Sequence, residues 1–379
     1  MPFSPDLIAP AVERYRRERD RYVKLADRVS EICRNDICDQ NAIRAQITFR
    51  VKSMKSFAGK LRRFSTHEDR NYNDVDEIFA SISDLAGVRI AAYQHEDCEK
   101  IVEHLNQVFR GPDGELLIDR KDRHLQDRSN FYRAIHAQVC LPEDELIGTY
   151  DNVDDISCEV QVCTMIAHVW NEIEHDIGYK PELDGPSEDE KKLIEMLGHT
   201  VRQGDQQISM LLAAHARRVS KQAEPTEPDP RTRLFRDVHD FVSRMQDYQN
   251  QAMPNFAKNS GQLFELIEDL GLNTPSSLDE ALAPFEIINL REEADQFTSY
   301  LIEKGFPSFA FDNASSDLML LRLFNNRLDH ILEVHKDRVG RGRGRPTRLY
   351  RLARHFKQWK HPQSQDAVFA ADVEPAAPE

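Results

Sequence analysis

Hydrophobic and polar positions repeat with two different periods in the first part of the chain, and segments of the two kinds alternate. Where the period is two, as in SCEVQV, the side chains of an extended strand point alternately to an apolar and a polar face. Where apolar residues recur every three or four positions, a helix is expected. Strands are predicted at residues 84–93, 132–141 and 157–162, and helices at 6–33, 53–63, 74–83, 95–109 and after a capping box that starts at Ser187. This interleaving favours an α/β protein with a β-sheet covered by helices.

The pattern changes near residue 221. The segment KQAEPTEPDP holds three prolines and several acidic residues, which is typical of a boundary between domains. Beyond it the apolar spacing is mainly helical, and the last residues, SQDAVFAADVEPAAPE, have the composition of a disordered tail. We therefore predict a first domain at residues 1–222, a linker at 223–230, a helical C-terminal domain at 231–362 and a disordered tail at 363–379.

Composition narrows the class of protein. The formal net charge is -15, so a polyanionic ligand would need a local basic patch rather than the overall field of the protein. We find neither a signal peptide nor an apolar run long enough to span a bilayer, so no membrane partner is expected. The six cysteines include no CxxC pair, which favours a reduced, cytoplasmic protein.

Two early segments have residue types suited to phosphate and metal binding. RVKSMKSFAGKLRR brings Arg50, Lys52 and Lys60 together in an acidic chain, and such cations can grip phosphates. A solvated helix face is the alternative for this segment taken alone. Asp84 precedes a strand in DLAGVRI, where a carboxylate can hold Mg²⁺ together with substrate phosphates. The alternative for Asp84 is an ordinary turn aspartate.

Two later strands each carry a polar face. Tyr132 begins the strand that contains His136, and its ring is placed to stack on a nucleobase, with an edge strand wetted on one face as the alternative. Glu159 and Gln161 share one face of SCEVQV, which suits a general base, a metal ligand or both; a salt bridge to a covering helix is the alternative. The chain has no Walker A loop and no GxGxxG, so side chains and Mg²⁺ would hold phosphates, as in a nucleotidyl- or pyrophosphoryl-transferase.

Four ordered segments together resemble the RelA/SpoT synthetase domain. They are RVKSMKSFAGKLRR, DLAGVRI, FYRAIHAQV and EVQVCTMIAHVWNEIEHDIGYK, all within residues 45–182. The resemblance implies a nucleotidyltransferase-like mixed β-sheet flanked by helices. It also implies a GTP/GDP diphosphokinase that transfers pyrophosphate from ATP to the ribose 3′-hydroxyl of GDP or GTP and makes (p)ppGpp, the alarmone of the stringent response. Because only 49 residues precede Arg50, too few for the hydrolase domain of long members, a stand-alone synthetase is expected.

The resemblance implies roles on the ATP side of the site. Arg50 and Arg89 resemble the residues on either side of the adenine. Lys52 and Lys60 resemble phosphate ligands, and Asp84 resembles a ligand of the Mg²⁺ cofactor.

The resemblance also implies roles on the acceptor side. Tyr132 resembles the tyrosine that stacks on guanine, and Arg133 and His136 are expected to bind the same nucleotide. Glu159 resembles the base that deprotonates the 3′-hydroxyl and is expected to touch Mg²⁺ as well. Gln161 resembles its supporting neighbour.

Two departures from the family pattern leave the acceptor open. Cys163 stands where the family commonly has arginine, and Phe131 stands where it often has glycine. One alternative is therefore a toxic relative that pyrophosphorylates the 3′ end of tRNA, and another is a degenerate fold that only binds nucleotide. A basic loop with Arg120, Lys121, Arg123 and Arg128 and the basic tract at 338–360 are the features that would favour tRNA. A regulatory or oligomerisation role is expected for the C-terminal domain, so a homo-oligomer is one expectation.

Overall fold

The computed structural model describes residues 3–66, 70–125, 127, 130–146, 148–178, 185–221, 231–245, 253–338 and 346–361. The chain divides into two compact units, residues 1–223 and 224–379, and each is described by itself. The linker predicted at 223–230 and the tail predicted at 363–379 lie outside the described residues. In the described part, no helix is both long enough and apolar enough to cross a bilayer.

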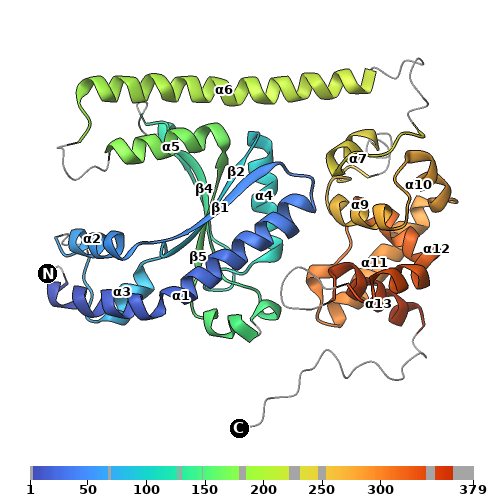
Figure 1. Ribbon diagram of the computed structural model, residues 1–379, viewed down its shortest axis with the longest axis horizontal. Coiled ribbons are helices and arrows are strands. Elements are labelled where there is room, and N and C mark those ends of the chain that lie inside the picture. The colour runs from blue at the N-terminus through green and yellow to red at the C-terminus, as the bar shows by residue number, and fades with distance from the viewer. Residues whose placement is uncertain are drawn as a thin grey trace, which may run out of the picture. The chain divides into compact units, whose positions relative to one another are not determined.

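The first unit is built on one five-stranded sheet with the strand order β1-β2-β5-β4-β3 (Figure 1). The central pair, β2 and β5, is parallel, and every other neighbouring pair is antiparallel. The prediction of a mixed sheet flanked by helices is therefore confirmed. The strands are β1 (Ala45–Val51), β2 (Ala86–Ala92), β3 (Ile118–Asp122), β4 (Arg133–Val139) and β5 (Cys158–Thr164).

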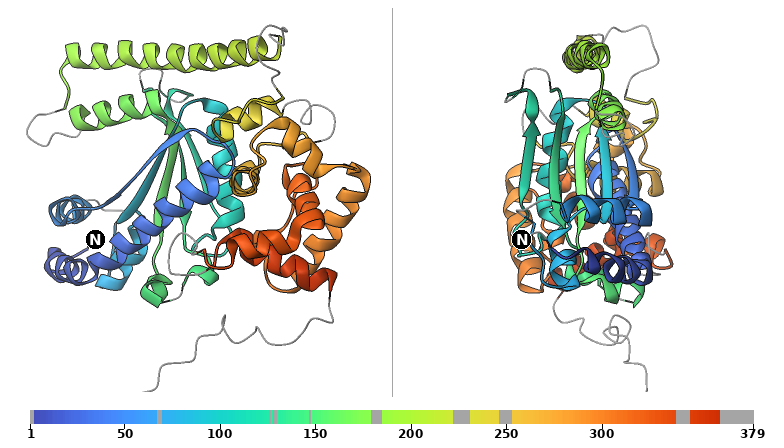
Figure 2. Two further views of the ribbon diagram at one scale, coloured as in Figure 1. Left: turned by 45° about the vertical axis from the view of Figure 1, so that its right-hand side comes forward. Right: turned by 90° about the vertical axis from the view of Figure 1, so that its left-hand side faces the viewer.

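Helices complete this unit and bury the apolar face of the sheet. Val88 and Ile90 of β2 and Val160 and Val162 of β5 belong to one core with residues of α1 and α4, because alternate strand residues share a face. Figure 2 shows α5 and α6 running side by side at one end of the strands. The helices are α1 (Ile8–Ile32), α2 (Met54–Phe64), α3 (Val75–Ser81), α4 (His95–Val108), α5 (Met165–Gly178) and α6 (Glu188–Lys221), and a π-helical segment, Cys33–Asp39, follows α1.

A second, smaller core attaches α5 and α6 to the segment that leads into β4. Phe131 and Trp170 are both buried in it. Gly198 of α6 leaves room for the aromatic ring, because a Cβ at this position would come within 2.3 Å of Phe131. The predicted capping box is present at the start of α6, where the Glu190 backbone N–H donates to Ser187 Oγ at 3.3 Å and the Ser187 N–H donates to the Glu190 carboxylate at 2.7 Å.

The second unit is helical, as the apolar spacing predicts. Its core is rich in phenylalanine and leucine, and Phe297, Phe324 and Phe356 are among its fully buried side chains. The helix α12 is interrupted at Arg327, where φ is -140° and ψ is 22°. The helices are α7 (Val238–Arg244), α9 (Ser260–Asp269), α10 (Pro275–Leu282), α11 (Ile287–Glu303), α12 (Asp317–His335) and α13 (Arg348–Lys360).

Candidate active site

The register of the sheet places polar side chains in two rows on one face. Gln161 of β5 pairs with Arg89 of β2 on one side and with His136 of β4 on the other. One step along, Glu159 pairs with Gly87 and with Gln138. Directly paired residues of neighbouring strands point to the same face, and residues two apart on a strand do so as well. The face opposite the apolar core is therefore polar across the three central strands.

Glu159 lies at the centre of this face and accepts two hydrogen bonds. Its Oε1 is 3.0 Å from His136 Nδ1, and Gln161 Nε2 donates to its Oε2 at 2.7 Å. Burial acts to raise the pKa of Glu159, but the hydrogen bonds from His136 and Gln161 outweigh burial, so the pKa lies below its ordinary value. Glu159 is therefore an ionised carboxylate at neutral pH, which a general base has to be.

His136 connects Glu159 to Tyr132. The Tyr132 hydroxyl is 2.7 Å from His136 Nε2, and burial raises the pKa of Tyr132 to about 12, so this hydroxyl stays protonated and donates to Nε2. His136 then carries its proton on Nδ1 and donates it to Glu159, an assignment that follows from the hydrogen-bond network. The three side chains form a continuous chain of hydrogen bonds.

Two cations from β3 and the turn after it lie beside this chain. Lys121 Nζ is 3.3 Å from His136 Nδ1, and the Arg123 guanidinium lies 4.9 Å from the centre of the Tyr132 ring. Because Nδ1 already donates to Glu159, Lys121 contributes its charge there rather than a hydrogen bond. Sequence reasoning placed both cations only in a basic loop and missed their contact with the predicted acceptor side.

Asp84 is held by the two lysines that were predicted to bind phosphate. Lys52 Nζ is 2.9 Å from Oδ2 of Asp84 and Lys60 Nζ is 2.8 Å from Oδ1. The Ser53 side chain caps α2 by accepting a hydrogen bond from the Ser56 N–H at 3.1 Å, which fixes the helix that carries Lys60. Burial acts to raise the pKa of Asp84, but hydrogen bonds and charge from Lys60 and Lys52 outweigh it and lower the pKa.

The carboxylates suit a metal that takes its remaining ligands from a substrate. The negative charge of Asp84 acts to raise the pKa of Glu159, so the two carboxylates interact electrostatically. Within the described ranges, no group of three or more His, Cys, Asp or Glu residues is arranged to hold a metal ion by itself. Mg²⁺ is commonly bound by one or two carboxylates plus substrate phosphates, so Asp84 and Glu159 fit that ion.

Arg89 extends from β2 toward α5. Its Nη2 is 2.7 Å from Glu172 Oε1. One turn earlier on α5, burial followed by the charge of Arg89 lowers the pKa of His168, and the charge of Arg50 contributes in the same direction. The structure thus brings Arg50 and Arg89 into one neighbourhood with His168 and Glu172. The i, i+4 spacing of these two α5 residues was the available sequence signal, and it was overlooked.

Cys163 ends the polar face of β5. It is buried, and burial raises the pKa of its thiol to about 12, with the charge of Arg89 acting against that shift. The thiol is therefore neutral at physiological pH and supplies no charge in place of the arginine that the family commonly has.

Arg133 is the one predicted site residue that the structure places away from the others. Side chains alternate between the two faces of the sheet along β4, so His136, three positions after Arg133, points to the opposite face. The Arg133 guanidinium instead contacts His95 Nδ1 at the start of α4 and lies 3.9 Å from the carboxylate of Asp205 in α6. In this structure Arg133 connects β4 to two helices.

The basic segments that would favour tRNA are largely engaged within their own units. Arg120, predicted in a basic loop, lies in β3 and pairs with Glu99 at 2.7 Å. Arg128 lies outside the described residues, as do residues 339–345 of the basic tract. Four of the described cations of that tract contact acidic or polar partners: Arg338 with Asp269, Arg348 with Gln262, Lys357 with Asp329, and Lys360 with Glu293. Two more, Arg351 and Arg354, lie over the aromatic rings of Phe309 and Tyr350.

Comparison with known sequences identifies the region that holds these side chains. Residues 49–184 match the family model described as "Region found in RelA / SpoT proteins". The chain is 28% identical over 156 residues to the GTP pyrophosphokinase YwaC of Bacillus subtilis (strain 168), which covers 40% of this chain and 66% of that relative. It is 28% identical over 136 residues to the GTP pyrophosphokinase YjbM of the same organism, covering 35% of this chain and 56% of YjbM. In both cases the chain spans less than two thirds of the relative's length.

Comparison with solved structures gives further matches, which cover about half of this chain. The crystal structure of small alarmone synthetase 1 from Bacillus subtilis is 22% identical and has a TM-score of 0.43, covering 53% of this chain and 97% of that one. The structure of that synthetase bound to its product pppGpp has the same identity and a TM-score of 0.42, with coverage of 54% and 99%.

Proposed function

We propose that this chain, which carries a RelA/SpoT domain at residues 49–184, is a pyrophosphokinase that uses ATP to modify the ribose 3′-hydroxyl of GDP or GTP. The observation that carries the proposal is the setting of Glu159. This carboxylate is half-buried, kept ionised by hydrogen bonds from His136 and Gln161, and lies in the field of a second carboxylate, Asp84. Such an arrangement suits removal of a proton next to bound phosphates.

In the proposed reaction Glu159 takes the proton of the 3′-hydroxyl. The 3′-oxygen forms a bond to the β-phosphorus of ATP, and the bond from that phosphorus to the oxygen bridging to the α-phosphate breaks. AMP leaves, and the pyrophosphate is now attached to the acceptor. A positioned base contributes roughly 10²–10⁴-fold in rate, and alignment of the two nucleotides contributes a further share.

The surrounding cations serve to bind and orient the two nucleotides. When ATP binds, Lys52 and Lys60 leave their ion pairs with Asp84 and pair with the phosphates instead. Arg50 and Arg89 hold the adenine. Glu172 of α5 fixes the position of Arg89 through their ion pair. Most of the catalytic effect in phosphoryl transfer comes from such positioning and charge neutralisation.

The acceptor is bound on the β4 side of Glu159. Tyr132 stacks on the guanine, and His136, fixed by its hydrogen bond to Tyr132, lies where the acceptor's phosphates approach, with Lys121 adding charge. Asp84 and Glu159 would hold Mg²⁺, which when bound neutralises charge that develops on the transferred phosphates.

A tRNA acceptor is the second candidate function. The specific observation in its favour is the pair of cations Lys121 and Arg123 beside His136 and Tyr132. Since Arg120 pairs with Glu99 and Arg123 lies over Tyr132, a guanosine nucleotide is the better-supported acceptor.

The test is a transfer assay with the purified full-length chain, Mg²⁺ and ATP labelled at its terminal phosphate. GDP, GTP and bulk tRNA are offered in parallel, and products are separated by thin-layer chromatography and on gels. Label in guanosine tetra- or pentaphosphate is expected. Label only in tRNA would assign the second candidate instead, and tight ATP binding without transfer in any lane would indicate a degenerate, nucleotide-binding fold.

Glu159→Gln is expected to reduce turnover by roughly 10²–10⁴-fold while ATP binding is retained, because the amide keeps the shape but cannot accept the proton. Glu103→Gln is the matched control, since Glu103 is exposed on α4, which packs against the opposite face of the sheet. Full turnover by Glu159→Gln would eliminate Glu159 as the base.

A further inference from the structure

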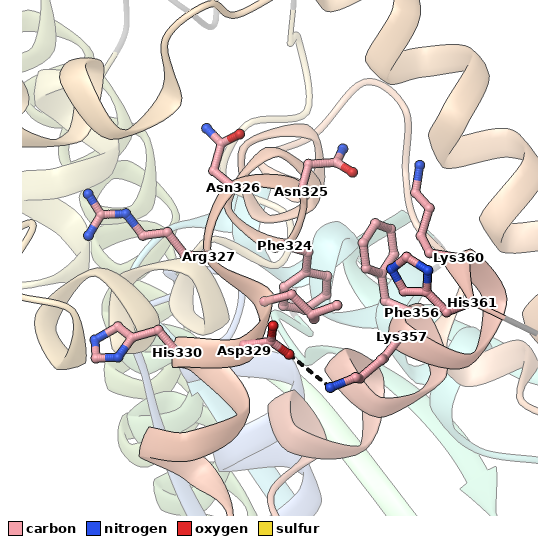
Figure 3. Close-up of a pocket in the computed structure, with 11 residues that line it drawn as sticks. Phe324, Asn325, Asn326, Arg327, Asp329, His330, Phe356, Lys357, Lys360 and His361 are labelled. Carbon is pink, nitrogen blue, oxygen red and sulfur yellow. Dashed lines mark hydrogen bonds and ion pairs between the residues drawn. The ribbon is translucent and has the colours of Figure 1, made fainter. Parts of the chain in front are cut away.

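The C-terminal unit contains a hollow that the function proposed above does not use. Its volume is about 670 Å³, which lies within the range of small-molecule sites. Figure 3 shows that it is formed where α12 is interrupted and where α13 ends. The lining residues are the run Phe324 to His330 together with Phe356, Lys357, Lys360 and His361.

The interruption of α12 accounts for the shape of this hollow. Consecutive residues of a regular helix point in all directions around its axis, so seven of them in a row cannot line one hollow. The non-helical backbone at Arg327 makes this possible. The break is also held in place, because Asn326 Nδ2 donates to the Ala281 carbonyl at 2.9 Å and Arg322 Nε donates to the Leu282 carbonyl at 3.1 Å.

The floor of the hollow belongs to the core of the unit. Phe324 and Phe356 are 0% and 1% exposed, and their ring centres are 5.5 Å apart. Side chains packed in this way are fixed before a ligand arrives, so a ligand does not have to order the floor.

The rim of the hollow carries more positive than negative groups, although the protein as a whole is acidic. Asp329 is the one carboxylate in the lining, and it pairs with Lys357 at 2.8 Å. Lys360 pairs with Glu293. Among the residues that the structure describes, the Arg327 guanidinium forms neither an ion pair nor a hydrogen bond. In Figure 3, Arg327 and His330 lie on one side of Phe324, whereas Lys360 and His361 lie on the other.

We propose that this hollow binds a small anion with two or more phosphate groups. Cations on both sides of a fixed apolar floor suit an extended oligophosphate better than a single phosphate. A guanidinium offers a planar pair of donors to phosphate oxygens, and an imidazole next to bound phosphate favours its protonated form. A uniformly solvated basic helix face would have neither the hollow nor the interrupted helix.

The test follows the imidazole signals of His330 and His361 by NMR in the full-length protein, because these signals report on the hollow and not on turnover. The signals are identified with His330→Gln and His361→Gln. Inorganic pyrophosphate and ADP are the probes, each titrated without Mg²⁺. Saturable shifts of both signals are expected. Stronger binding of ADP would show that a nucleotide is the source of the phosphates, and equal binding would show that the phosphates alone are recognised.

Arg327→Gln is expected to weaken binding by about tenfold to a hundredfold, as for loss of one charge-assisted hydrogen bond. Lys360→Gln tests the opposite side of the rim, and a similar weakening of binding is expected. Lys336→Gln is the matched control, because Lys336 follows α12, pairs with Glu333 and does not line the hollow. Absence of saturable shifts with both probes would overturn the proposal, and so would equal weakening by Lys336→Gln. Because the readout is independent of transfer, loss of the proposed synthetase activity would not affect it.

Discussion

At the scale of single residues, the protonation of Glu159 depends on its neighbours. Burial favours the neutral acid, and the hydrogen bonds from His136 and Gln161 reverse that preference. The pairing of Glu159 and Gln161 on one strand face could be predicted from the period-two pattern alone. The ion pairs from Lys52 and Lys60 to Asp84 could not, because they join residues that are 32 and 24 positions apart. The same period-two pattern also indicates that Arg133 and His136 point to opposite faces, and that signal was not used.

His136→Leu is expected to shift the acidic limb of the turnover profile to higher pH. Without the His136 hydrogen bond, burial dominates, the pKa of Glu159 rises, and less of the base is ionised at a given pH. In the unsubstituted protein, the acidic limb of the turnover profile is expected at a pH below the ordinary pKa of a glutamate, because the pKa of Glu159 is lowered. The measurement is turnover against pH with saturating nucleotides.

Gln138→Leu is the control for this experiment. Gln138 lies on the same strand and pairs in register with Glu159, but its amide donates to the Ser83 carbonyl at 2.9 Å and to Ser157 Oγ at 2.8 Å. An identical acidic limb for His136→Leu and the unsubstituted protein would show that His136 does not set the protonation of Glu159.

At the scale of elements, the position of β5 decides which side chains meet. Because β5 lies between β2 and β4, it brings Arg89 and His136 to either side of Gln161. The strands and the cap of α6 could be predicted from local patterns. The contact of Gly198 with Phe131 could not, since it depends on how α6 returns across the segment before β4. It shows how the chain accommodates phenylalanine where the family often has glycine.

Gly198→Ala is expected to destabilise the first unit by about 1–3 kcal/mol. The new methyl group would meet the Phe131 ring at 2.3 Å, and the cost of overpacking exceeds the gain in helix propensity. Gly204→Ala is the matched control on the same helix, because its methyl group would meet only the movable end of Ile166, at 2.6 Å. Urea unfolding measures both, and an equal loss of stability in the two variants would contradict the packing argument.

At the scale of the whole molecule, each apolar core among the described residues is made of residues from one unit. The large core and the small core around Trp170 use residues up to Val201, and the third core uses residues from Phe235 to Phe356. The composition of the chain at residues 223–230 predicts a linker, and the two compact units of the structure meet along the chain between residues 223 and 224. The sequence supports only a general expectation for the helical unit, a regulatory or oligomerisation role, because no motif in it points to a known chemistry.

A chain that ends at residue 223 is expected to fold without the second unit and to retain transfer activity. Its cores and every proposed site residue are complete within it. The measurements are thermal unfolding by circular dichroism and the labelled-ATP assay. A fragment without a cooperative transition would show that the first unit needs the second for its stability.

The distribution of cysteines has a practical consequence. All six thiols are buried, all lie in the first unit, and burial raises the pKa of each. A buried, protonated thiol reacts slowly with alkylating reagents and oxidants until the structure around it opens. The rate at which a thiol reagent labels the native protein therefore measures how often the structure around the cysteines opens, and all of them lie in the first unit. Thiol labelling of the intact chain thus reports the local stability of the first unit, and the second unit, which has no cysteine, does not contribute to the signal.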